Sequence, residues 1–301
     1  MSSVENEGVH RLNNELRDAW QAQAVPGYPE TRRIFDEWLA QLAVPETARF
    51  SPGYAGRVPV LHVGTPESEG SSRTVLHFHS GGYLMGSAHG YRSFGGYLSA
   101  HTRSRVVLPD YRLAPENPFP AAIEDGLEVY TRLLEEGRAA DSIVLSGDSA
   151  GGGLVCVLVQ WIRDHGLPLP AGVVSLSPVA DYTHSGASRT ENDGKDPLVL
   201  RDLLLGMGAD YFGDRDPRAP GLSPVFGNWA GLPPMRFYAG SIEVLRDDAK
   251  LCAEAAAAAG VDATYTEGED MAHIWTLFAD RLPEARATLD EIGDFVERVC
   301  A

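Results

Sequence analysis

The sequence predicts an α/β protein with a mostly parallel, doubly wound sheet. Short runs of almost wholly apolar, β-branched residues recur along the chain, among them VVL at 106–108 and IVL at 143–145. Strands of this composition are covered on both faces, which is typical of parallel sheets. Segments with helical periodicity separate the runs, and such alternation of strand and helix is the pattern of doubly wound folds.

Two helices are expected ahead of the first strand. Apolar residues recur three and four positions apart in 10–24 and 30–42, and the VPGYP segment between them stops a helix. We therefore expect N-terminal cap helices within residues 1–50 and the α/β domain over residues 51–301.

The alternation begins near residue 57. The expected strands are 57–63, 74–78, 105–108, 142–145, 172–176, 235–239 and 263–266. The expected helices are 91–102, 121–136, 150–165, 247–259 and 283–299. An insertion at 180–232 interrupts the pattern, because it contains turns and one expected helix at 198–211. Its apolar side chains need a covered face, so we expect it to pack on the N-terminal helices as a lid.

The composition is that of a folded globular protein, and its charge excludes some classes of partner. Apolar residues make up 44% of the chain and charged residues 22%, which excludes a disordered protein. Lys and Arg number 25 against 42 Asp and Glu, so the net charge is −17. A surface this acidic repels nucleic acid and anionic lipid. We therefore expect a neutral or cationic small molecule as the partner.

The three cysteines, Cys156, Cys252 and Cys300, are expected to be reduced thiols. They are odd in number and widely spaced, with no CxxC pair for zinc or redox chemistry. The N-terminal segment MSSVENEGVHRLNNEL is polar, and no stretch approaches the roughly 18 uninterrupted apolar residues of a membrane span. These features predict a cytoplasmic protein that is not membrane-bound.

The segment SIVLSGDSAGGG at 142–153 contains the strongest catalytic motif. An apolar strand leads into G-x-S-x-G and then into a helix, which is the context of a nucleophile elbow. Gly147 and Gly151 remove Cβ atoms that would clash in such a turn, and Ser149 would stand at the top of the sheet. A phosphate-binding loop is excluded because the lysine of that motif is absent.

A second glycine-rich turn follows the strand at 74–78. Consecutive glycines let the backbone N–H groups of Gly81 and Gly82 point toward one oxygen atom, as in an oxyanion hole. His77 and His79 share one strand face, but no third ligand follows at a suitable spacing, so a zinc site is not expected.

A serine nucleophile needs a base and an orienting acid. Glu243 follows an apolar strand, and His273 lies in the loop after the next strand. The order serine, acid, histidine is that of the α/β-hydrolase triad. Asp247 and Asp248 remain alternatives for the acid, although aspartates in the first turn of a helix also stabilise its dipole.

Together these motifs resemble the hormone-sensitive lipase family of α/β-hydrolases, most of all its bacterial acetyl-esterase and carboxylesterase members. The likeness extends from about residue 57 to the C-terminus. It rests on the order of five segments: HSGGY at 79–83, DYRLAPENPFPAAIEDG at 110–126, GDSAGG at 147–152, GSIEVLRDD at 240–248 and HIWTLFADRLPEA at 273–285. The resemblance implies an α/β-hydrolase fold with an eight-stranded sheet and a helical cap formed by the N-terminus and the insertion.

The resemblance also implies roles for the residues at the strand ends. Ser149 matches the family nucleophile and His273 its general base. Glu243 stands where most members have aspartate and a subgroup has glutamate. The family oxyanion hole corresponds to the backbone N–H groups of Gly81, Gly82 and Ala150.

One position departs from the family pattern, because Ser80 replaces the first glycine of HGGG. If that position required a positive φ, serine would be strained there. Either the loop tolerates the serine or its geometry is shifted.

The predicted function is that of a serine carboxylesterase that hydrolyses small neutral esters through an acyl-enzyme, with no metal or organic cofactor. The same triad would serve a lactonase, an amidase or an acyltransferase, and a receptor on this fold would bind a small molecule without catalysis. Four side chains are expected to line the substrate pocket or, alternatively, to pack the cap on the core: Tyr83, Met207, Tyr211 and Trp275. Analogy with the family further suggests a homodimer paired through the last sheet edge.

Overall fold

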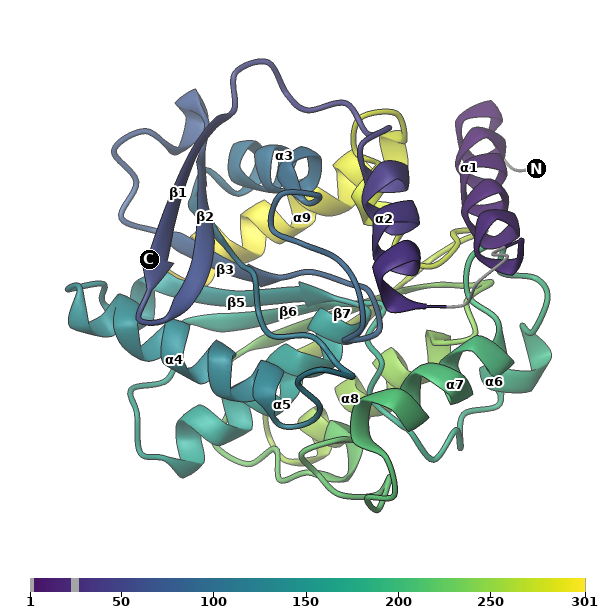
Figure 1. The fold of residues 1–301 in the computed structure, drawn as a ribbon. Coiled ribbons are helices and arrows are strands. Elements are labelled where there is room, and N and C mark those ends of the chain that lie inside the picture. Colours follow the sequence, from purple (N-terminus) through teal and green to yellow (C-terminus); the bar gives the residue numbers. More distant parts are fainter. Residues whose placement is uncertain (1–2, 23–26, 301) are drawn as a thin grey trace.

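The computed structural model describes residues 3–22 and 27–300, and within them the strands form one eight-stranded sheet (Figure 1). Their order is β1-β2-β4-β3-β5-β6-β7-β8. The strands are β1 (Arg49–Ala55), β2 (Val58–Gly64), β3 (Thr74–Phe78), β4 (Arg105–Pro109), β5 (Ile143–Asp148), β6 (Gly172–Leu176), β7 (Met235–Gly240) and β8 (Ala263–Gly268).

The sheet is parallel from β4 to β8, and antiparallel only where β1 pairs with β2 and β2 with β4. Every residue of β3, β5 and β6 is buried, as their apolar composition predicts. The predicted strands are confirmed to within a few residues at their ends. β1 was not expected, because it is largely exposed and contains Pro52 and Gly53.

Helices cover both faces of the sheet (Figure 1). One face carries α3 (Arg92–Thr102) and α9 (Pro283–Val299), and the other carries α4 (Ala121–Glu135), α5 (Ala150–Asp164) and α8 (Arg246–Ala258). All five match the predicted segments. The central helix α5 is buried along most of its length, which fixes the turn that leads into it from β5.

The remaining helices lie near the carboxyl ends of the parallel strands (Figure 1). They are α1 (Val4–Gln21), α2 (Tyr28–Leu39), α6 (Ser188–Glu191) and α7 (Arg201–Phe212). The Tyr28 hydroxyl donates to the Asp210 carboxylate, so α2 and α7 are in direct contact.

The bounds of these helices differ from those predicted for local reasons. α1 begins earlier, since the Ser3 side chain accepts a hydrogen bond from the Asn6 N–H at 3.1 Å and caps the helix. Residues 23 and 24 of the helix predicted at 10–24 lie outside the described residues. α7 begins only at Arg201 because Leu200 before it is in an extended conformation, with φ −107° and ψ 154°, which is not helical. Among the described residues, no helix combines the length and the apolar character needed to cross a bilayer.

Candidate active site

Ser149 occupies a strained turn between β5 and α5. Its backbone has φ 54° and ψ −116°, a conformation that L-residues rarely adopt. The two glycines of the motif are required by close backbone approach. A Cβ on Gly147 would lie 2.2 Å from the Gly151 carbonyl oxygen, and one on Gly151 would lie 2.0 Å from the Phe78 carbonyl oxygen. Glycine at both positions therefore lets the chain turn sharply enough to present Ser149.

Three side chains from separate loops meet at this turn. His273 Nε2 lies 2.9 Å from Ser149 Oγ, and His273 Nδ1 lies 2.9 Å from Glu243 Oε2. The loops follow β5, β7 and β8, so the parallel order of these strands brings the three residues to one edge of the sheet. All three are buried, with Ser149 7% exposed. The structure thus joins Ser149, His273 and Glu243 in one hydrogen-bonded line.

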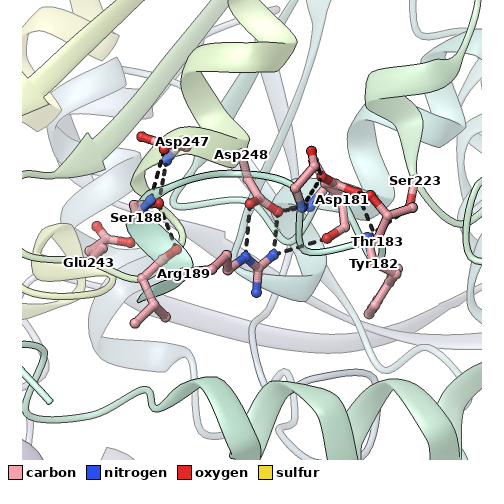
Figure 2. Close-up of polar contacts among 12 residues, drawn as sticks. Asp181, Tyr182, Thr183, Ser188, Arg189, Ser223, Glu243, Asp247 and Asp248 are labelled. Carbon is pink, nitrogen blue, oxygen red and sulfur yellow. Dashed lines mark hydrogen bonds and ion pairs between the residues drawn. The ribbon is translucent and has the colours of Figure 1, made fainter. Parts of the chain in front are cut away.

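The two alternative acids make other contacts. Figure 2 shows Asp248 paired with Arg189, whose Nη2 donates to Oδ2 at 2.7 Å. Both partners are almost fully buried, and Asp248 also accepts the backbone N–H groups of Ala180 and Asp181. Asp247 accepts the backbone N–H of Ser188. Neither aspartate is bonded to His273, so Glu243 is the acid at the imidazole.

The carboxylate of Glu243 is fixed from both sides. Its Oε1 accepts the backbone N–H of Gly240 at 2.5 Å and the hydroxyl of Ser177 at 2.8 Å, which leaves Oε2 for His273. The Ser177 hydroxyl oxygen in turn accepts the backbone N–H of Ile274 at 3.2 Å. These bonds hold the carboxylate in one orientation toward the imidazole.

The charge around His273 favours its protonated form. Burial by itself lowers the pKa of this imidazole, but the hydrogen bond and charge of Glu243, with the charges of Asp196 and Asp148, raise the pKa above its ordinary value. An imidazolium formed when Ser149 loses its proton would therefore be stabilised in place.

The loop after β3 places backbone donors beside Ser149. Gly81 has φ 118° and Gly82 has φ 63°, both in the region that favours glycine. A Cβ on Gly81 would lie 2.2 Å from the Met85 carbonyl oxygen. Within the described residues, the N–H groups of Gly81 and Gly82 have no acceptor. Ala150 opens α5, where backbone N–H groups lack helical partners.

The serine in place of the usual glycine is accommodated without backbone strain. Ser80 does not have a positive φ, so it bears none of the steric cost that such a conformation would bring. Its hydroxyl lies 2.5 Å from the Tyr91 hydroxyl, and Tyr91 donates to Asp148 Oδ2 at 2.6 Å. The Tyr91 hydroxyl oxygen also accepts the Ser80 backbone N–H at 2.9 Å. The loop tolerates Ser80 because its side chain has buried partners.

Ser80→Gly is expected to keep kcat/KM for a p-nitrophenyl ester within about tenfold of the wild type, equal to about 1.4 kcal/mol of barrier. The backbone conformation is open to either residue, and Tyr91 keeps its bonds to the Ser80 N–H and to Asp148. Steady-state assays of the two proteins check this. A collapse of turnover would show that the Ser80 hydroxyl takes part in the reaction.

His77 and His79 are held by structural contacts. The His77 ring nitrogens lie 3.1 Å from Ser146 Oγ and 3.2 Å from Asp148 Oδ1. The His79 ring stacks on Tyr111 with centroids 4.2 Å apart, and its Nδ1 lies 2.7 Å from the Ser80 carbonyl oxygen. Over the described part of the chain, no three His, Cys, Asp or Glu side chains gather as a metal site would require.

A narrow apolar pocket opens onto Ser149, and its lining differs from the predicted one. Met207 lines it, whereas Tyr83, Tyr211 and Trp275, for which packing of the cap on the core was the alternative, do not. Tyr83 and Tyr211 are buried and stack on each other with centroids 3.9 Å apart, and Trp275 is buried. The pocket wall is instead formed mainly by Trp20, Phe35, Met85, Val179, Tyr182, Leu198, Val199, Leu203, Leu204 and Ile274.

Sequence reasoning missed two polar residues beside the site. The side chain of Asn192 donates to the carbonyl oxygens of Ser241 and Glu243, and the side chain of Asp196 accepts the backbone N–H of His273. Both lie in an irregular segment with no periodicity. The only available signal was their position just before an apolar run in the insertion.

Comparisons with known proteins agree with this geometry. Residues 75–277 match the family model described as the alpha/beta hydrolase fold. The chain is 40% identical over 224 residues to an acetyl-hydrolase of Streptomyces hygroscopicus, covering 74% of this chain and 75% of the relative. It is 32% identical to an esterase of Acinetobacter venetianus, covering 75% of each chain. A solved esterase of the bacterial hormone-sensitive lipase family superimposes over 100% of both chains with a TM-score of 0.95 and 35% identity.

Proposed function

Because the chain belongs to the hormone-sensitive lipase branch of the α/β-hydrolase fold family, we propose that it is a serine carboxylesterase acting on small neutral esters. The observation that carries the proposal is the continuous line from Ser149 through His273 to Glu243, beside the N–H groups of Gly81 and Gly82 that have no acceptor among the described residues. The names of the relatives, acetyl-hydrolase and esterase, support the same reaction class.

In the proposed mechanism His273 Nε2 takes the proton of Ser149 as its oxygen attacks the ester carbonyl carbon. Glu243 accepts the Nδ1 hydrogen bond and stabilises the imidazolium. The N–H groups of Gly81, Gly82 and Ala150 would bind the tetrahedral oxyanion. His273 then protonates the leaving alcohol, and water attacks the acyl-enzyme by the same steps, which releases the acid and restores Ser149.

Labelling with a fluorophosphonate probe tests the proposal directly. The expected result is stoichiometric modification of Ser149, located by mass spectrometry, together with hydrolysis of p-nitrophenyl esters. Parallel assays with an amide and a lactone compare the other reactions open to the same triad. A folded protein that neither reacts with the probe nor hydrolyses any ester would contradict the proposal.

On the acid side, activity is expected to be lost at a higher pH than it would be if the histidine base had its ordinary pKa. The base must be neutral to accept the Ser149 proton. Burial lowers the pKa of His273, but Glu243, Asp196 and Asp148 together raise it above its ordinary value. Activity should therefore be lost as pH falls through a value above about 6.5. Profiles of kcat/KM against pH measure it, and a midpoint clearly below that value would contradict the expectation.

We propose that α1, α2 and residues 180–232 act as a cap that sets substrate size. The pocket wall takes Trp20 from α1, Phe35 from α2, and Leu203 and Met207 from α7. The inner space at Ser149 is only about 40 Å³, whereas a neighbouring cavity of about 450 Å³ shares Met207 with it. A Cβ added at Gly82 would lie 2.5 Å from the Met207 sulfur. The Met207 side chain therefore packs directly against the loop that carries Gly81 and Gly82.

Met207→Ala is therefore expected to join the two cavities and shift the enzyme toward longer acyl chains. The ratio of kcat/KM for p-nitrophenyl octanoate to that for the acetate should rise about tenfold. Leu205→Ala is the matched control, since Leu205 lies on the same helix but is exposed and does not line either cavity. An unchanged ratio in the Met207 variant would show that this side chain does not limit chain length.

Two narrower proposals concern assembly and compartment. β8 ends the sheet, so we propose a homodimer in which two copies pair through this strand, to be checked by light scattering of the purified protein.

We propose the cytoplasm as its compartment because the cysteines are unpaired and two of them, Cys156 and Cys252, are buried as free thiols. Cell fractionation checks this.

A further inference from the structure

We propose that Asp196 is a positioning residue that ties the wall of the substrate pocket to the backbone of His273. The inference deepens the function proposed above and rests on it, since it assumes that His273 is the base. Asp196 lies in the insertion at 180–232, between β6 and β7, and is not part of the triad.

The geometry joins two segments that are far apart in the sequence. Asp196 Oδ2 accepts the backbone N–H of His273 at 3.1 Å, across 77 positions of the chain. Asp196 Oδ1 accepts the N–H groups of Leu198 at 2.8 Å and Val199 at 3.2 Å. Leu198, Val199 and His273 all line the pocket at Ser149. One carboxylate therefore holds both a wall of the pocket and the loop that carries the imidazole.

A carboxylate suits this position better than a neutral amide. All three partners of Asp196 are N–H donors, and an ionised carboxylate offers acceptors only. An asparagine could accept from Leu198 and Val199 through its oxygen, but its NH₂ group would then face the His273 N–H, donor against donor. Bulk water cannot offer these two donors an acceptor, since the Asp196 side chain is fully buried.

The negative charge of Asp196 also acts on the imidazole of His273. Burial raises the pKa of Asp196 to about 6, the charge of His273 lowers it and that of Glu243 raises it. The carboxylate is thus ionised at the slightly alkaline pH of a typical esterase assay, where it favours the imidazolium. Asp148 is the further acid whose charge bears on His273. On the side of α1, the Arg17 guanidinium donates to the neighbouring Pro197 carbonyl oxygen at 3.0 Å.

The same insertion also holds the acid of the triad, by separate contacts. Asn192 Nδ2 donates to the Glu243 carbonyl oxygen at 2.8 Å, and the Ser188 hydroxyl donates to the Val244 carbonyl oxygen at 2.9 Å. Asp196 makes the corresponding contact with the histidine loop, so the insertion is bonded to both loops that complete the triad.

The test compares Asp196→Asn with Asp181→Asn. Asp181 is a matched control: it is buried in the same insertion and its carboxylate accepts backbone N–H groups, those of Thr183 and Ser185, but none from a triad loop. For Asp196→Asn we expect kcat per active site, titrated with a fluorophosphonate, to fall at least about tenfold. Its acid limb should also move to lower pH, because one of the charges that raise the pKa of His273 is gone. Asp181→Asn is expected to keep the wild-type limb.

Asp196→Glu separates charge from position. It keeps the negative charge but moves the carboxylate, so kcat should stay reduced while the acid limb remains near that of the wild type. The inference is overturned if Asp196→Asn keeps kcat within twofold and leaves the limb unmoved. Should Asp196→Asn not fold, a wild-type kcat per active site in Asp196→Glu would overturn it. Failure of the proposed function is seen separately, as a wild-type protein that the probe does not label.

Discussion

Replacing Ser149 with alanine is expected to lower kcat for a p-nitrophenyl ester by at least about 10,000-fold. The variant lacks the hydroxyl oxygen that lies 2.9 Å from His273 Nε2, so no acyl-enzyme can form on residue 149. The N–H groups of Gly81 and Gly82 would remain in place, and they would retain a small rate above that of water. Initial rates of the variant, measured at high enzyme concentration, give the size of the loss.

A suitable control is Ser175→Ala. Ser175 is another fully buried serine, on the neighbouring strand β6, and its hydroxyl donates to the Gly152 carbonyl oxygen rather than to the triad. Both variants lose one buried hydroxyl, but only the Ser149 variant should lose turnover and probe labelling. Hydrolysis at the wild-type rate by Ser149→Ala would remove the basis of the proposed mechanism.

The parts of the fold that were predicted correctly are those determined by local composition. β3, β5 and β6 are apolar throughout because both their faces are covered, and that composition is visible in the sequence. β1 is a strand only because β2 pairs with it across seven positions, and Pro52 and Gly53 conceal this in the sequence. Whether this segment forms a strand depends on its pairing with β2, which a short window of the sequence does not reveal.

The same distinction separates the site residues that were found from those that were missed. Ser149, Glu243 and His273 follow predicted strands, so the topology of a parallel sheet brings them together at one edge. Asp196 follows no strand, and its bond to the His273 N–H exists only in the folded chain. Tyr83 was expected either to line the pocket or to pack the cap on the core, and its stacking on Tyr211 of α7 matches the second alternative, which composition alone could not decide.

Glu243→Gln is expected to lower kcat by about 10,000-fold, the effect of holding a triad histidine in the wrong tautomer. The Gly240 N–H is a donor only, and it lies 2.5 Å from Glu243 Oε1. The Ser177 hydroxyl donates to the same oxygen while accepting the Ile274 N–H. A glutamine must therefore turn its carbonyl oxygen toward Gly240 and its NH₂ group toward His273 Nδ1.

That arrangement reverses the hydrogen bond at the imidazole. Nδ1 becomes an acceptor, so the single ring proton of neutral His273 sits on Nε2 and points at Ser149 Oγ. An imidazole in this tautomer cannot take the serine proton. Glu243→Asp keeps two acceptor oxygens on a shorter arm, so its loss of kcat should be much smaller than that of the glutamine variant. Steady-state kinetics of both variants, normalised to folded protein, check the order. A glutamine variant within tenfold of the wild type would show that the carboxylate does not orient the imidazole.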